Sequence, residues 1–268
     1  MLQRVMLAIL IVFSCAAHAA EQNLPLELQQ EILINKASTI DDALQQIGKL
    51  KLADKKFNAF FNNNLDFQKR IIDTLVNKFY KESDIYILLL ANESEEADEL
   101  AKQQLGLLIA ARLQAELWIK DMKPKLTYGN LMWQVITGLA GRMYCPDDTV
   151  QCNNLNAIKT LMKYAQIPSD SIVSSQVYSR IADGLWKDNN LSKAYEYTDY
   201  FLSQGIPLNT AGYAGSLSTI NDMFVVESSV KKQASSLKQY FNYLIKKGAK
   251  INPLHEGKMR SRGLLDQQ

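Results

Sequence analysis

Apolar residues recur along most of the chain at intervals of three and four positions, the spacing that places them on one face of an α-helix. The intervals are clearest in two stretches, at Ile71, Leu75, Val76 and Phe79 and at Leu105, Leu108, Ile109 and Leu113. No run of alternating apolar and polar residues is long enough to predict a sheet. The pattern therefore predicts an all-α protein.

One long helix is predicted between Asn92 and Pro124. Asn92 can cap its first turn, and the acidic run 93–99 suits the positive end of the helix dipole. Pro124 follows its expected end. The acidic run could also be imagined as a cation site, but a solvated helix start is the favoured interpretation.

Four segments of the chain resemble one another. They are Leu113–Thr127, Asn156–Asp170, Glu196–Thr210 and Gln239–Pro253, at successive offsets of 43, 40 and 43 residues. One aligned column holds Trp118, Leu161, Phe201 and Leu244, and the next holds Ile119, Met162, Leu202 and Ile245. A small or turn-forming residue follows in three copies, at Ala165, Gly205 and Gly248. The recurring feature is a helix end, because each copy places its apolar pair shortly before a turn.

A helix with a single apolar stripe cannot bury it alone, and stacking a neighbouring copy against it extends the core in one dimension. A period near 40 accommodates two helices and a loop, so the sequence predicts a solenoid of stacked helical pairs over residues 70–253. A weaker fifth copy at 70–84 sets the first boundary. The alternative, chance similarity among unrelated helix ends, remains open. Solenoids bind extended partners through exposed positions that vary between copies. We therefore predict partner contacts at one varied column, which holds Asp121, Tyr164, Gln204 and Lys247.

The last two copies, FLSQGIPLNTAGYAGS and LIKKGAKINP, resemble the second helix and following turn of ankyrin repeats. Gly205 and Gly248 stand where that family has its helix-ending glycine, and Asn209 and Asn252 match its Asn-bearing turn. The period is longer than the family's period of about 33, and no Thr-Pro-Leu-His tetrapeptide occurs. The resemblance implies degenerate ankyrin repeats or another two-helix repeat with the same helix end.

A segment at 20–69 is similar to an F-box. Leu24, Pro25, Glu27, Ile32 and Leu33 match the opening of that family, and the pair Lys56-Phe57 matches its close. The resemblance implies an adaptor for a ubiquitin ligase, which in an exported protein would require delivery into a host cell. A plain helical cap on the end of the solenoid explains the same residues equally well.

The first nineteen residues have the pattern of a secretory signal peptide. Arg4 precedes nine apolar residues from Val5 to Phe13, and Ala17-His18-Ala19 supplies small residues at the cleavage site. The apolar run is too short for a membrane span. Val12-Phe13-Ser14-Cys15 partly resembles a lipoprotein box, which would attach a lipid anchor at Cys15. Both interpretations predict a secreted or periplasmic protein.

The other two cysteines, Cys145 and Cys152, bracket a polar loop. In an oxidising compartment they could form a local disulfide, and two unpaired thiols are the alternative. Their spacing is not a usual zinc motif, so no metal site is expected.

The composition offers little for catalysis. The 268 residues carry a net charge of +2, which gives no footprint for nucleic acid. Beyond the signal segment the one histidine is His255, in a polar C-terminal tail at 254–268, and no nucleotide-binding or metalloprotease motif occurs. We therefore predict a non-catalytic protein-binding scaffold without a cofactor. An envelope glycoside hydrolase remains the competing class, because such enzymes need only two placed carboxyls and aromatic side chains such as Trp118, Trp133 and Trp186.

Overall fold

The computed structural model describes residues 34–80, 95–126, 130–142, 154–167, 171–227 and 231–265. All regular structure in these ranges is helical, so the predicted all-α class is confirmed. The helices of the N-terminal part are α3 (Ile40–Ala53), α4 (Lys55–Asn63) and α5 (Leu65–Phe79). They are followed by α7 (Glu95–Leu113), α8 (Glu116–Met122), a 3-10 turn (Lys123–Lys125), α9 (Leu131–Ala140), α10 (Asn154–Met162), α11 (Ser171–Asp188), α12 (Leu191–Ser203), α13 (Gly215–Glu227), α14 (Lys231–Lys246) and α15 (Pro253–Ser261).

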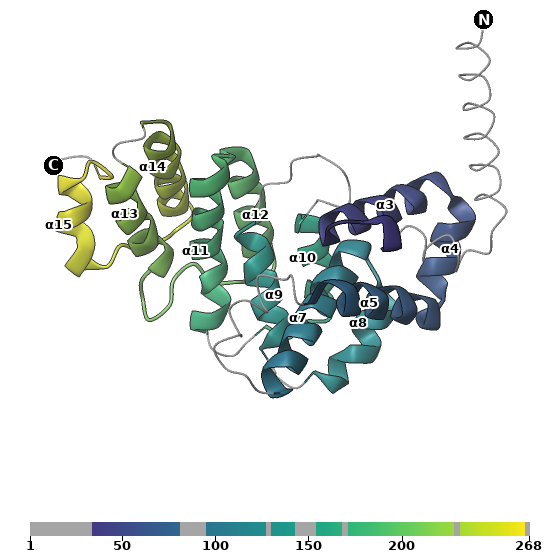
Figure 1. Ribbon diagram of the computed structural model, residues 1–268. Coiled ribbons are helices and arrows are strands. Elements are labelled where there is room, and N and C mark those ends of the chain that lie inside the picture. The colour runs from purple at the N-terminus through teal and green to yellow at the C-terminus, as the bar shows by residue number, and fades with distance from the viewer. Residues whose placement is uncertain are drawn as a thin grey trace, which may run out of the picture.

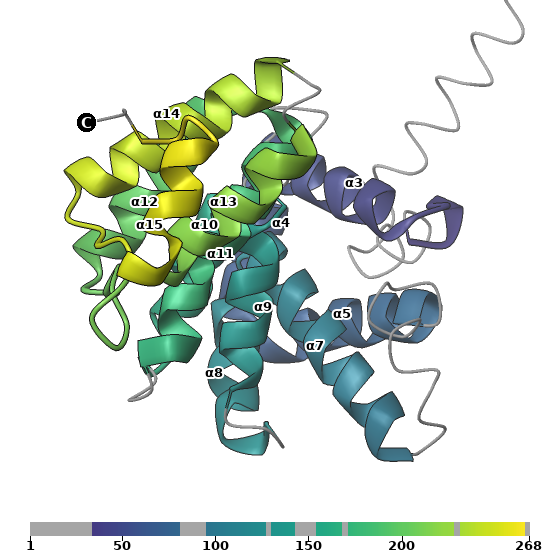
Figure 2. The same ribbon diagram turned by 90° about the vertical axis from the view of Figure 1, so that its left-hand side faces the viewer.

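The helices from α7 onward stack as pairs. The first helices of the pairs, α7, α9, α11 and α13, contact one another in succession, and α15 continues this row beyond α13. The second helices, α8, α10, α12 and α14, each pack against the first helix of their own pair. Figure 1 shows the pairs side by side between α3–α5 at one end and α15 at the other. Figure 2 shows the same stack from the α15 end.

The three N-terminal helices follow one another almost without loops. Asp54 ends α3 and caps α4 by accepting hydrogen bonds from the amides of Lys56 and Phe57. Asn64 ends α4 and caps α5 in the same way, through the amide of Phe67. Phe57 and Phe67 also meet edge to face within a cluster of phenylalanine rings between α4 and α5. This unit packs against the stack through contacts of α5 with α7 and α8.

The long helix expected between Asn92 and Pro124 is interrupted, so that prediction is wrong in its extent. Gln114 adopts a left-handed backbone conformation with φ of +56°, and α7 ends before it while α8 begins after it. The amide of Ala115 donates to the carbonyl of Ala110 at 2.8 Å, which closes the end of α7. Because the chain reverses its direction here, Trp118 packs against α7 at Gly106. A Cβ atom added to Gly106 would lie 2.9 Å from the Trp118 indole. The break between α7 and α8 therefore allows Trp118 to pack against α7, at a glycine that leaves room for its ring.

The C-terminal stretch 254–265, expected as a polar tail, instead contributes to a packed helix. Asn252 caps α15 through the amide of Leu254, and Pro253 occupies the first turn, where its missing amide hydrogen is not needed. Met259 and Leu264 are fully buried, although most of the residues around them in the sequence are polar. The helix α15 packs against α13.

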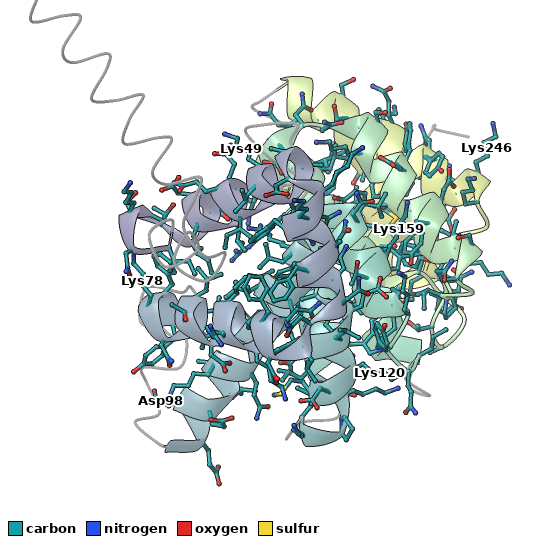
Figure 3. The ribbon with its side chains drawn as sticks, turned by 90° about the vertical axis from the view of Figure 1, so that its right-hand side faces the viewer. Lys49, Lys78, Asp98, Lys120, Lys159 and Lys246 are labelled. Carbon is teal, nitrogen blue, oxygen red and sulfur yellow. The ribbon has the colours of Figure 1, made fainter. Side chains whose placement is uncertain are left out.

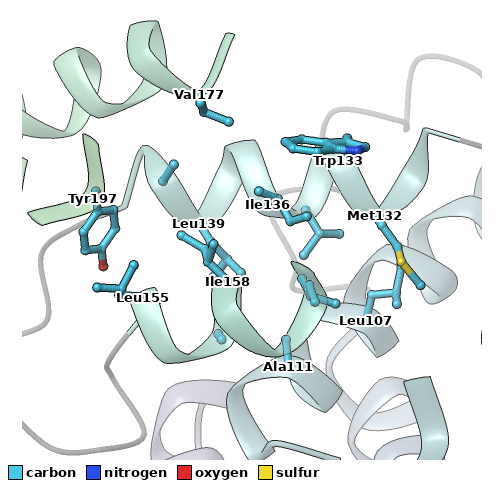
Figure 4. Close-up of a cluster of buried hydrophobic side chains, with 14 of the residues drawn as sticks. Leu107, Ala111, Met132, Trp133, Ile136, Leu139, Leu155, Ile158, Val177 and Tyr197 are labelled. Carbon is cyan, nitrogen blue, oxygen red and sulfur yellow. The ribbon is translucent and has the colours of Figure 1, made fainter. Parts of the chain in front are cut away.

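The core runs through the stack without interruption. In the middle of the molecule, Ile136 and Leu139 of α9 lie against Ile158 of α10 (Figure 4). Trp133 is buried in the same cluster, and its indole nitrogen donates to the carbonyl of Gln166 at 2.6 Å. The shared core holds each second helix in a fixed position relative to its neighbours.

Several sequence predictions fall on parts of the chain outside the described residues. They are the signal peptide 1–19 with Cys15, the F-box-like residues Leu24, Pro25, Glu27, Ile32 and Leu33, and the cysteines Cys145 and Cys152. Among the helices that are described, none has the length and apolar character needed to cross a bilayer.

Candidate interaction surface

The aligned apolar column occupies corresponding places on the second helices of the four pairs. Trp118 lies on α8, Leu161 on α10, Phe201 on α12 and Leu244 on α14, and none is more than 4% exposed. In the next column Ile119 is buried, whereas its three counterparts are only partly buried. The first column therefore provides the interior of the stack, as the repeat spacing predicts.

The two glycines at helix ends form equivalent turns. Gly205 has φ of +79° and Gly248 has φ of +100°, conformations that glycine adopts without steric cost. After Gly205, the amide of Ile206 donates to the carbonyl of Phe201 at 3.1 Å. After Gly248, the amide of Ala249 donates to the carbonyl of Leu244 at 2.9 Å. Both bonds reach back to the buried column, which gives the two copies the same helix-ending motif.

The turn that follows α12 is fastened to the turn that follows α14. The Asn209 side chain donates to the carbonyl of Gly248 at 2.9 Å and accepts from the amide of Lys250 at 2.8 Å. The carbonyl of Lys250 in turn accepts from the amide of Ala214 at 2.9 Å. Successive turns are thus joined by hydrogen bonds along the same edge of the stack.

A column of polar residues on the second helices connects each copy to the next. Glu116 accepts hydrogen bonds from Lys163 and, at 3.1 Å, from the hydroxyl of Tyr164. Lys159 places its ammonium 5.5 Å from the centre of the Tyr200 ring. These contacts form the first two steps of a ladder, which we call the polar ladder.

The third step of the polar ladder joins α12 to α14. Asp199 pairs with Lys247 at 2.7 Å and accepts from the hydroxyl of Tyr243 at 2.5 Å. Glu116, Lys159 and Asp199 are aligned positions of successive copies. Their partners lie at different positions of the repeat, because Lys163 aligns with Lys246 and not with Lys247, the lysine that binds Asp199. One aligned position therefore contacts the following copy at each of the three interfaces, through partners that differ between copies.

The polar ladder perturbs the titration of its members. A hydrogen bond from Lys163 lowers the pKa of Glu116, and a hydrogen bond from Lys247 lowers the pKa of Asp199. Burial raises the pKa of Tyr243, and the neighbouring Asp199 carboxylate raises it further. These groups keep their ordinary charges at neutral pH. Ion pairs at an exposed surface contribute little stability, so the ladder chiefly fixes the register of the helices.

Three of the four predicted contact residues are engaged within the molecule. Asp121 pairs with Lys69 of α5 at 3.1 Å and with Lys125 at 2.8 Å, and these hydrogen bonds lower its pKa. Tyr164 and Lys247 belong to the polar ladder. Gln204 is exposed and donates to the hydroxyl of its neighbour Ser203 at 3.3 Å. In the predicted column, Asp121 and Tyr164 are therefore partly buried, and only Gln204 and Lys247 are exposed.

The column one position earlier is exposed in all four copies. It consists of Lys120, Lys163, Ser203 and Lys246, which we call the outer column. Figure 3 shows Lys120, Lys159 and Lys246 along one side of the molecule. Sequence reasoning missed this column, although it is polar in every copy. Both columns are polar in every copy, so polarity alone does not identify the one that is exposed throughout.

The pockets in the described part of the molecule include two that no carboxylate lines. One lies between α7 and α9, and the other where α3 and α4 meet the end of α7. Trp118 and Trp133 are buried and Trp186 is partly buried against the core, so their rings contribute to packing. The described residues also contain no group of three or more His, Cys, Asp or Glu side chains placed to hold a metal ion.

Comparisons with known proteins found no matching family model, no matching curated protein and no matching solved structure.

Proposed function

We propose that the stacked pairs are degenerate ankyrin-like repeats and that the chain is an exported, non-catalytic scaffold for protein binding. The observation that carries the proposal is the recurrence of the buried column and of one polar position, because Glu116, Lys159 and Asp199, which are aligned, each contact the following copy. Such a stack presents a long surface made of corresponding positions.

The outer column is the surface that we assign to the partner. Lys120, Lys163 and Lys246 are exposed on successive second helices, with Ser203 at the corresponding place on α12. Lys163 donates to Glu116, but more than half of its side chain remains exposed. A stripe of this charge favours a protein segment that carries acidic side chains, because complementary charge orients a partner and speeds its encounter.

Site-specific photocrosslinking tests this assignment. A photoreactive amino acid is placed at Ser203 of the full chain, and a matched chain carries it at Lys49, an exposed position of α3. The proposal predicts that Ser203 captures a defined protein from an envelope or host extract, that Lys49 does not, and that capture weakens as salt is raised. Equal capture from both positions, or no defined product from Ser203, would contradict the assignment.

The charge of the outer column is tested by reversing it. Lys120→Glu combined with Lys246→Glu should reduce capture at Ser203 by about tenfold or more, because like charges facing an acidic partner are costly. The control, Lys49→Glu combined with Lys55→Glu, changes two exposed lysines of the N-terminal helices and should leave capture unchanged. Unchanged capture by the outer-column variant would rule out an acidic partner at this surface.

A further inference from the structure

A polar pocket lies where the N-terminal helices meet the end of α7, away from the outer column. It has a volume of about 170 Å³. The polar and backbone groups that line it come from Lys51, Asn58, Asn62, Arg112, Leu113 and Gln114. A water molecule takes about 30 Å³ in the liquid, so the pocket has room for a small ion and its hydration.

Arg112 brings a guanidinium to this pocket that is only partly satisfied. Its side chain is 11% exposed, and one terminal nitrogen pairs with Asp41. Its Nε atom is buried and has no hydrogen-bond partner among the described residues. A guanidinium carries five N–H donors, so Arg112 retains donors beyond the nitrogen that pairs with Asp41.

Lys51 supplies a second cation. Its ammonium donates to the carbonyl of Leu113 at 2.7 Å and lies 4.2 Å from the centre of the Phe61 ring. Neither partner carries a formal negative charge. Burial lowers the pKa of Lys51 to about 8, the direction expected for an ammonium that lacks a counterion.

The α4 side of the pocket is neutral. Asn58 and Asn62 line it, and Asn62 donates to the side-chain oxygen of Asn58 at 3.2 Å. The acidic group in contact with the pocket's cations is Asp41, whose side chain is 70% exposed and bound to Arg112. The lining thus combines two cations with amide groups, the combination that recognises phosphate and carboxylate oxygens.

We propose that this pocket binds a small oxyanion, a phosphate or a carboxylate group, between Arg112 and Lys51. The anion would accept from Arg112 and from Lys51, which keeps its bond to the carbonyl of Leu113. It would join α3 and α4 to the end of α7 at the left-handed Gln114. This site is separate from the proposed protein-binding surface, and each can fail without the other.

Amide NMR of the full chain tests the site, with inorganic phosphate and acetate titrated separately at constant ionic strength. The proposal predicts saturable shifts of the amides of Asn58, Asn62 and Gln114 with at least one of the two anions. Asn58→Asp should weaken that binding by about tenfold or more, because it adds a negative charge to the lining. Asn63→Asp, an exposed position on the same helix outside the pocket, should change it less than about twofold.

Three results would overturn the proposal: shifts that do not saturate, shifts spread over surface lysines as from an adventitious ion only, or equal affinity in the two variants. If Asn58→Asp fails to fold by circular dichroism, Asn62→Asp replaces it, since Asn62 is exposed and lines the same pocket. Saturable binding of phosphate alone would identify a phosphate site, and saturable binding of acetate alone a carboxylate site.

Discussion

The two ends of the molecule achieve the same all-helical packing by different means. From α11 to α14, corresponding residues recur: Phe201 and Leu244 fill the core, and Gly205 and Gly248 end the helices. The helices α3–α5 are held against the stack by single contacts without a counterpart in other copies, such as the hydrogen bond from Lys51 to the end of α7. Recurrence of this kind is visible in a sequence, whereas single tertiary contacts are not.

Gln68 shows how the N-terminal region depends on such single contacts. Its buried amide donates to the carbonyl of Phe61 at 2.9 Å and accepts from the amide of Trp118 at 2.9 Å. One side chain thereby satisfies backbone groups of α4 and α8 that would otherwise be buried without partners. The predictions below separate the two regions by removing one recurring or one single feature at a time.

The largest effect is expected from the core of the stack. Phe201→Ala removes a fully buried ring that meets Tyr178 and Tyr200 edge to face, and it should lower the free energy of unfolding by about 3–5 kcal/mol. Urea denaturation followed by circular dichroism measures the change. Leu254→Ala, at a side chain that is 85% exposed, should cost less than about 0.5 kcal/mol. A loss below about 1 kcal/mol at Phe201 would mean that this column is not the core.

The next effect is expected at Gln68. Gln68→Leu keeps most of the volume but leaves the Phe61 carbonyl and the Trp118 amide without a partner, at about 1–3 kcal/mol each. The same urea measurement should show a loss of about 2–4 kcal/mol. Gln239→Leu, at an exposed position of α14, is the matched control and should be nearly neutral. Equal stabilities of the two variants would show that the N-terminal region does not depend on this amide.

A smaller effect is expected at the helix-ending glycine. Gly248→Ala forces a side chain into a left-handed conformation and should destabilise the protein by about 1–2 kcal/mol. Gly257→Ala lies within α15 in open space and should stabilise the protein by about 0.5–1 kcal/mol. Thermal unfolding of the pair checks the opposite signs. A stabilising Gly248→Ala would be inconsistent with the recurring turn.

The last effect concerns pH. The pKa of Lys51 is lowered to about 8 in the folded protein, below the usual value of 10.5 that the unfolded chain retains. Between these values the unfolded chain binds more protons, so this group makes the folded protein more stable as pH rises. The free energy of unfolding of the wild type should therefore increase relative to that of Lys51→Met between about pH 8 and pH 10. The comparison subtracts the ionisation of tyrosines, which is common to both proteins, and a constant difference would contradict the shift.

The sequence was sufficient for the helical class and for the buried column because both follow from spacing. It was also sufficient for the turns at Gly205 and Gly248, because glycine after an apolar helix end has a direct conformational reason. It missed the break at Gln114, since glutamine carries no signal for a left-handed conformation and the packing of Trp118 on Gly106 depends on the fold.

The predicted contact column is exposed only at Gln204 and Lys247, whereas the column next to it is exposed in all four copies. Polarity and variability do not distinguish Asp121 from Lys120, because both are charged neighbours on the same helix. Their difference arises from the rotation of α8 against α5, which brings Asp121 to Lys69 and leaves Lys120 exposed. Such rotations are set by contacts between helices and cannot be obtained from the period alone.

If the stacked pairs are equivalent units, one of them can be removed without loss of the fold. Deleting residues 164–203 joins Lys163 directly to Gln204, which is aligned with the deleted Tyr164. The helix α10 thereby acquires the helix end of α12. A control deletion of residues 174–203 joins Val173 to Gln204, which are not aligned, and so breaks that correspondence. If the units are equivalent, the in-register variant keeps its helical content per residue and unfolds in one cooperative urea transition, whereas the control does not. Loss of cooperative unfolding in both variants would contradict the claim.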